Sequence, residues 1–171
     1  MKFRDIPQFT AWGNYQVDVG VRFLMSTLED YIKDYKLDMN PDFQREHVWT
    51  EAQQVRFLEF FFRGGKTGRN ILFNCAGFNH GRLGQMVLVD GKQRLEAFRR
   101  FFKNEIEVFN YKYSEYEDKP DNMLTMRFFV NDLATREEVL QWYIDLNAGG
   151  TVHTEAEIER VRKILVLEKK K

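Results

Sequence analysis

Hydrophobic residues recur at three- and four-residue steps in several stretches of the chain, which is the spacing of a helix with one buried face. This periodicity predicts helices over about 18–35, 50–62 and 92–103, and two further helices of roughly 12 residues that begin near Thr135 and Thr154. Three of the helix starts carry a capping box, in which a threonine is followed three residues later by glutamine or glutamate. The pairs are Thr50 with Gln53, Thr135 with Glu138, and Thr154 with Glu157. Gly64 and Gly65 predict a left-handed end to the second helix.

Short apolar runs bounded by polar residues predict strands at 70–74, 85–90, 105–109 and 124–130. The run Met86–Val89 is uninterrupted, which is typical of a strand buried on both faces, so we expect the second strand to be central in its sheet. A short extended segment at 37–39 leads into a turn at Asn40-Pro41. The stretch 111–122, rich in Tyr, Asp and Glu, is predicted to be a surface loop or hairpin.

Composition changes this picture by excluding several classes of protein. The chain of 171 residues is 43% hydrophobic and 30% charged and has no repeat or linker, so we expect one ordered domain over 1–171. Its apolar runs are far shorter than the roughly 20 residues of a membrane span, and the lone Cys75 cannot form an internal disulfide, which favours the cytoplasm. Lys plus Arg and Asp plus Glu each number 26, so any nucleic-acid site must be a local patch.

The strongest candidate site is the junction between the apolar strand and the helix that follows it, Val89-Asp90-Gly91-Lys92-Gln93-Arg94. Free backbone amides at a helix start attract anions, and Gly91 allows the backbone to approach a ligand closely. Lys92 and Arg94 oppose the helix dipole unless an anion lies in front of them, so the pattern is typical of a phosphate site. The alternative is that both cations point into water or pair with Asp90.

The segment Pro41–Trp49 mixes polar and aromatic residues without a helix or strand period. Phe43 and Trp49 suit stacking on a planar ring, while Gln44 and Arg45 can donate to the edge of that ring or to phosphate. The segment is therefore a candidate base- or ribose-binding loop. The alternative is that the aromatic side chains anchor the loop to the core.

The segment Asn147-Ala148-Gly149-Gly150-Thr151 follows a predicted helix, and its two glycines favour a left-handed helix cap. The amides of a glycine-rich turn also cradle phosphate oxygens, and Asn147, Thr151 and His153 place polar donors around it. We therefore keep both interpretations.

The chain has no motif for metal-dependent or nucleophilic catalysis of a known kind. His47, His80, His153 and Cys75 lack the spacing of a zinc site, so no structural metal is expected. Gly64-Gly65-Lys66-Thr67 lacks the earlier glycine of a Walker loop and follows a helix instead of a strand. A Mg²⁺ ion brought by a triphosphate needs only one or two carboxylates, and Asp90 is the first candidate ligand.

Three segments in order, Pro41–Arg45 with Val48-Trp49, Val89–Leu95, and Asn147 with Gly149–Thr151, resemble the domain-of-unknown-function family 262. That family forms the N-terminal part of GmrSD-type modification-dependent restriction enzymes and belongs to the ParB/sulfiredoxin-like superfamily. The resemblance covers about 14–165 and looks most like the short stand-alone members of phages and prophages. It implies an α+β domain with a small mixed sheet packed by several helices and a C-terminal helical pair.

The resemblance also implies a chemistry. In ParB-like domains the corresponding turn holds a nucleoside triphosphate, so Asp90, Gly91, Gln93 and Arg94 are expected to meet the phosphates, with Gln44 and Arg45 lining the same cleft. The family commonly has glutamine where this chain has Lys92, which adds a phosphate contact. The turn lacks the cysteine or serine of sulfiredoxins, so reductase chemistry is not expected. The chain ends at Lys171 without a His-Asn-His nuclease domain, so DNA cutting is not expected either.

Two hypotheses from different classes follow. In the first, the protein is a nucleotide-dependent switch or NTPase in which Lys92 and Arg94 hold the triphosphate, Asp90 orients Mg²⁺ or water, and Gln93 and Arg45 stabilise developing charge. The remaining nucleotide-binding candidates are Gln44, Trp49, Gly91, Asn147, Gly149, Gly150 and Thr151. In the second, it is an adaptor for DNA or for a restriction-system protein, with a basic patch. That patch consists of Arg99, Arg100 and Lys103, extended by Arg160, Arg162 and Lys163. Weak ParB-like nuclease activity is a third alternative.

Overall fold

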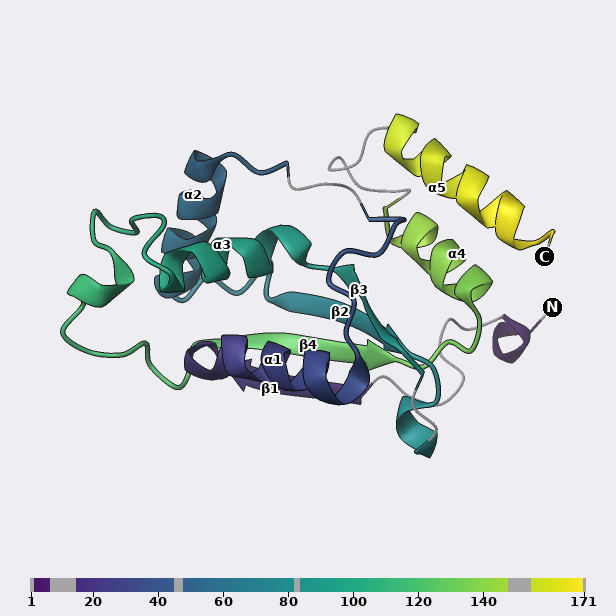
Figure 1. The fold of residues 1–171 in the computed structure, drawn as a ribbon, viewed down its shortest axis with the longest axis horizontal. Coiled ribbons are helices and arrows are strands. Elements are labelled where there is room, and N and C mark those ends of the chain that lie inside the picture. The colour runs from purple at the N-terminus through teal and green to yellow at the C-terminus, as the bar shows by residue number, and fades with distance from the viewer. Residues whose placement is uncertain (1, 7–14, 45–47, 82–83, 148–154, 171) are drawn as a thin grey trace.

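The computed structural model describes residues 2–6, 15–44, 48–81, 84–147 and 155–170, which form an α+β arrangement around one mixed sheet (Figure 1). Its four strands are β1 (Tyr15–Gly20), β2 (Asn70–Cys75), β3 (Met86–Asp90) and β4 (Thr125–Asn131). They are ordered β1-β4-β2-β3, with β2 and β4 parallel and both outer pairs antiparallel. The α+β fold with a small mixed sheet is therefore confirmed.

The helices form two layers. They are α1 (Leu24–Tyr35), α2 (Glu51–Phe62), α3 (Lys92–Phe102), α4 (Arg136–Asn147) and α5 (Glu155–Glu168). Side chains from α1, α2 and α3 share one core with the alternate strand residues that include Phe73, Leu88 and Phe128. Helices α4 and α5 form a second core with Val89 and Phe43, against which Leu72 and Val87 pack. The second layer therefore covers the β2–β3 half of the opposite face (Figure 1).

Strand β3 lies at an edge of the four-stranded sheet, so the expectation that it is central is wrong. The strand is apolar throughout because both of its faces are buried. Met86 and Leu88 belong to one core and Val89 belongs to the other. The outer edge of β3 is also covered. The backbone of Asp38 donates to Met86 O at 2.8 Å and accepts from Leu88 N at 2.9 Å, which confirms the short extended segment predicted at 37–39.

Two predicted elements are wrong, a helix start and a strand, because local hydrophobic spacing does not show which segments find a pairing partner. Residues 18–20 belong to β1, where Val17 and Val19 face the core at a two-residue period, and the α-helix begins only at Leu24 after a 3-10 turn at Val21–Phe23. Residues 105–109 form no strand. Ile106 and Val108 are buried, but their segment makes a single bridge between Val108 and Tyr111.

The capping residues predicted at Thr50 and Thr135 are confirmed. Thr50 and Gln53 form a reciprocal capping box at the start of α2, and the side chain of Glu138 accepts from both Thr135 N and its hydroxyl. Gly64 has φ +85° beyond the end of α2, as a left-handed stop requires. Thr154 lies outside the described residues. No helix in the described part of the chain is long and apolar enough to cross a membrane.

Candidate functional site

The strand–turn–helix junction forms as its sequence predicts, and Gly91 is the residue that permits it. Gly91 has φ +111°, and a Cβ atom added to it would lie 2.4 Å from Ile71 Cδ1 on the neighbouring strand. Helix α3 starts directly after it, with no acidic residue in its first turn and no side-chain cap. The start of α3 therefore carries the partial positive charge of a helix N-terminus without an acidic side chain in its own first turn.

Two of the candidate segments are joined by hydrogen bonds at this junction. Gln44 Nε2 donates to the carbonyl oxygen of Leu88 at 2.8 Å, in the strand that precedes the turn. Gln93 Oε1 accepts from the backbone amides of Val48 and Trp49, both at 3.1 Å. The loop that carries Arg45 is thus fixed at both ends to the junction, while Arg45 itself lies outside the described residues.

We expect Gln93→Leu to destabilise the fold by roughly 2–3 kcal/mol, because it leaves two backbone amides without their acceptor beside a side chain that is 8% exposed. Gln93→Glu is the matched control, because a carboxylate still accepts both bonds. Urea unfolding of the two variants measures the difference. A leucine variant as stable as the parent protein would show that the two hydrogen bonds do not hold the loop.

Arg94 and Lys92 leave the first turn of α3 toward different surroundings. Arg94 is 18% exposed and forms an ion pair with Asp90, so for this residue the sequence alternative of an internal pair is realised. Lys92 lines a groove between α1 and α3 instead. The junction thus carries two cations and one carboxylate at a helix start, an excess of positive charge that suits an anion.

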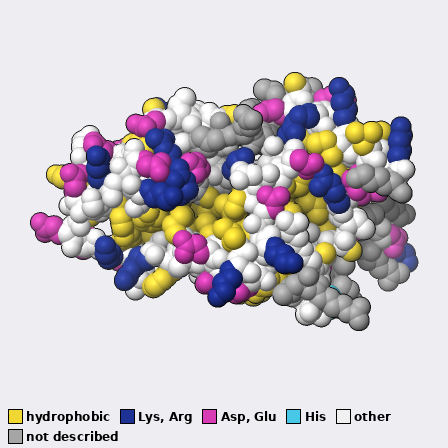
Figure 2. Space-filling model, viewed as in Figure 1, with side chains coloured by type: hydrophobic (Ala, Val, Ile, Leu, Met, Phe, Trp, Pro, Cys, Tyr) yellow, Lys and Arg dark blue, Asp and Glu magenta, His cyan; other side chains and the backbone are white. Residues whose placement is uncertain are grey.

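The groove between α1 and α3 has a volume of about 900 Å³. Its floor is apolar, with Leu28 from α1 and Leu95 from α3, and its polar lining includes Asn40, Lys92 and Glu96. Figure 2 shows hydrophobic side chains exposed along the middle of this face, with Lys and Arg side chains over α3 beside them. A groove of this size is in the range of small-molecule sites.

Of the third candidate segment, the structure describes only Asn147, at the end of α4. The side chain of Asn147 donates to Tyr143 O at 2.7 Å, which caps the end of α4, and Gly149, Gly150 and Thr151 lie outside the described residues. The Tyr143 ring packs edge-on against Phe43, with centroids 5.2 Å apart. Helix α4 is therefore in direct contact with the loop that bears Gln44.

Arg160 on α5 also holds this loop, a role that sequence reasoning missed. Its guanidinium donates to the carbonyl oxygens of Asp42, Phe43 and Gln44 at 2.8, 2.9 and 3.1 Å. Arg136 on α4 adds a two-pronged contact to the Asp42 carboxylate at 2.7 and 2.8 Å. Nothing in the spacing of the sequence signalled that these carbonyl groups converge on Arg160.

The two aromatic residues of the loop serve its packing. Phe43 is 2% exposed inside the second core, so the expectation that it stacks on a ligand is wrong, and the anchoring alternative holds. Trp49 is partly buried, with its ring 5.5 Å from that of Phe57, and its carbonyl oxygen accepts from Gln54 Nε2 at 3.5 Å. Trp49 is thus a candidate fluorescence reporter of ligand binding at the junction.

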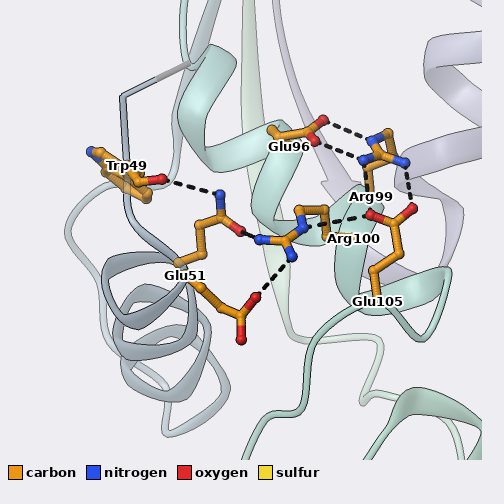
Figure 3. A network of polar contacts seen from close by, with 7 residues as sticks. Trp49, Glu51, Glu96, Arg99, Arg100 and Glu105 are labelled. Carbon is orange, nitrogen blue, oxygen red and sulfur yellow. Dashed lines mark hydrogen bonds and ion pairs between the residues drawn. The ribbon is translucent and has the colours of Figure 1, made fainter.

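The predicted basic patch on α3 is largely neutralised by carboxylates (Figure 3). Arg99 forms two bonds to Glu96 and two to Glu105, which raise the pKa of Arg99 and lower the pKa of the Glu105 carboxyl. Arg100 binds Glu51 at 2.9 Å and the side-chain oxygen of Gln54 at 2.7 Å. Phosphates of a nucleic acid would have to displace these carboxylates from Arg99 and Arg100. Lys103, the third residue of the predicted patch, is exposed and lines the groove.

Asp90 is the carboxylate closest to the turn in sequence, and its side chain is 45% exposed. A Mg²⁺ ion carried by a triphosphate would compete with Arg94 for it. In the described part of the chain, no group of three or more His, Cys, Asp or Glu side chains is arranged to hold a metal ion.

Comparison with known proteins identifies the family. The family model described as the GmrSD restriction endonuclease, N-terminal domain, matches residues 28–162, a range that includes all three candidate segments. Among curated proteins nothing matches the chain, and neither does any solved structure, so the ParB-like assignment of the fold stays a prediction. Because the matched range covers most of the 171 residues, the chain belongs to the GmrSD restriction endonuclease N-terminal domain family.

Proposed function

We propose that this chain is the nucleoside-triphosphate-binding component of a restriction system, with the triphosphate held at the junction 90–94. The restriction role rests on the family to which the chain belongs. The nucleotide role rests chiefly on one observation, the joining of loop 41–49 to the start of α3 by the side chains of Gln44 and Gln93. That arrangement fixes both described ends of the loop beside a helix start whose sequence carries Lys92 and Arg94.

Charge supports a phosphate ligand at this position. The formal charges of Lys92 and Arg94, together with the positive end of α3, outweigh that of Asp90, and in the sequence Arg45 falls between Gln44 and Val48, the residues that join the loop to the junction. The planar guanidinium of Arg94 suits two phosphate oxygens, and its pair with Asp90 holds it in one place before a ligand arrives. Bound phosphate would share Arg94 with Asp90.

The groove between α1 and α3 suggests where the rest of the nucleotide lies. Phosphates that contact Lys92 leave the base and ribose beside Asn40 and the apolar groove floor. In this arrangement Asp90 orients Mg²⁺ or a water molecule, while Gln93 chiefly positions the loop that carries Arg45. Binding is the core of the proposal, and hydrolysis is its extension.

Titration of the protein with each of the four ribonucleoside triphosphates and Mg²⁺, followed by Trp fluorescence and calorimetry, tests the binding. We expect saturable binding of at least one triphosphate, and much weaker binding of the corresponding nucleoside. Phosphate release, measured with and without DNA at two salt concentrations, tests hydrolysis. If no triphosphate binds while DNA binds in a salt-dependent way, the nucleotide proposal is wrong and the adaptor hypothesis replaces it.

A further inference from the structure

A second pocket, none of whose lining residues belongs to the junction 90–94, lies beside the segment 105–122 that follows α3. This segment projects at the left end of Figure 1, where it includes the short 3-10 helix Tyr113–Glu115. The pocket has a volume of about 200 Å³. Five aromatic side chains line it, namely Phe62, Phe101, Phe109, Tyr113 and Tyr116, and Asp118, Lys119 and Asp121 form its lip.

One wall of the pocket is a turn at Phe109 and Asn110 with an energetically unfavourable backbone conformation. Phe109 and Asn110 have φ +52° and +65°, a left-handed conformation that is rare for a bulky residue such as phenylalanine. Glu59 holds this turn through a 3.2 Å bond from Phe109 N, and the Tyr116 hydroxyl donates to Val108 O at 2.6 Å. The surrounding contacts thus fix Phe109 in a conformation that places its ring in the pocket wall.

The charge of the segment selects the sign of a ligand. Residues 106–122 contain five acidic and two basic side chains, whereas the whole chain has no net charge. The faces of aromatic rings carry negative potential and attract cations. The aromatic rings and the carboxylates therefore both attract a cation, and both disfavour binding of a phosphate or a nucleic acid.

The chain already places an ammonium group in this environment. Lys119 Nζ lies 5.0 Å from the centre of the Tyr113 ring, within the range of a cation–π contact. Lys119 is exposed and its side chain is long and flexible, so a ligand cation can displace it. Lys119 acts in this arrangement as a tethered competitor at the lip.

We propose that this aromatic pocket binds an alkylammonium group of the size of the trimethylammonium end of choline or of a trimethylated lysine side chain. The partly exposed rings of Phe62, Tyr113 and Tyr116 supply cation–π contacts, and the pocket volume accommodates one such group. Asp118 and Asp121 supply the counter-charge. The proposal does not depend on nucleotide binding at the junction 90–94.

The first test compares choline with 3,3-dimethyl-1-butanol, which has the same shape and no charge. We expect choline to shift the ring resonances of the tyrosines in NMR titrations of the full chain, and the uncharged analogue to bind at least roughly tenfold more weakly. A second arm replaces choline with a peptide that carries trimethyl-lysine, and with the same peptide carrying unmodified lysine. Tighter binding of the methylated peptide than of choline would identify a protein side chain as the source of the ammonium group, and the reverse order would identify a free ligand.

Two substitutions make the test independent of folding. Lys119→Ala removes the tethered competitor and should tighten choline binding by about two- to fivefold, a gain that a damaged fold does not produce. Asp118→Asn should weaken binding by a similar factor of about two to five, while Asp34→Asn on α1 serves as the control of equal charge change. Equal binding of choline and its uncharged analogue, no binding of either, or no gain from Lys119→Ala would overturn the proposal.

Discussion

Arg94→Ala is expected to weaken triphosphate binding at least about tenfold, because it removes a guanidinium that can make charge-assisted hydrogen bonds worth roughly 1.5–3 kcal/mol to phosphate. The fold should lose only about 1 kcal/mol or less, since the Asp90 carboxylate left behind is 45% exposed and stays hydrated. Calorimetric titration gives the dissociation constant, and urea unfolding gives the stability. The two measurements separate loss of a ligand contact from loss of structure.

Arg127→Ala is the matched control for that experiment. Arg127 pairs with Asp18 across β1 and β4 at 2.9 Å, so the variant also breaks an ion pair while leaving the junction intact. Arg94→Lys adds a second comparison, because it keeps the charge but loses the two-pronged geometry. If Arg94→Ala binds triphosphate as tightly as Arg127→Ala does, the phosphates do not lie at this turn.

Gly91→Ala should be among the most destabilising single substitutions in the chain, with an expected loss of about 2–4 kcal/mol. The new Cβ would lie 2.4 Å from Ile71 Cδ1, and alanine also disfavours φ +111°. For a domain of this size the loss corresponds to a fall in Tm of roughly 4–16 °C. Thermal unfolding followed by circular dichroism measures it.

A double-mutant cycle separates the two causes. Ile71→Val removes the Cδ1 atom and costs about 0.5–1.5 kcal/mol alone, yet combined with Gly91→Ala it should restore about 1 kcal/mol relative to the sum of the single effects. Gly64→Ala is the control for backbone strain alone, because Gly64 has φ +85° and its added Cβ meets nothing within 4 Å among the described residues. Its expected cost is about 1 kcal/mol. Strictly additive effects of Gly91→Ala and Ile71→Val would show that the backbone of the turn shifts and relieves the contact between the new Cβ and Ile71 Cδ1.

The parts of the fold that the sequence predicted are those set by local chemistry. The capping pair Thr50 and Gln53 begins α2, and the apolar run followed by Asp90-Gly91 gives a strand, a turn and a helix. What local pattern did not predict depends on distant partners. Val17 and Val19 become part of a strand because β4 pairs with them, and the position of β3 at an edge depends on how the other strands are ordered.

The candidate site shows the same division. The residues of the junction were predicted from helix electrostatics, and their family resemblance is confirmed by the match over 28–162. The contacts that assemble the site were not predictable, because Arg160 meets the carbonyls of the loop at 42–44 from a helix more than a hundred residues away. The different surroundings of Lys92 and Arg94 likewise depend on what packs beside α3, which the sequence spacing does not show.

The order of strands in the sheet also determines when each strand can find its pairing partner during synthesis. As the chain leaves the ribosome, β2 and β3 can pair early, but β1 has to wait for Thr125–Asn131, more than a hundred residues later. At translation rates of about 5–20 residues per second, the N-terminal strand stays without its partner for roughly 5–20 s. β1 is therefore the strand of this sheet that spends the longest time without its pairing partner during synthesis.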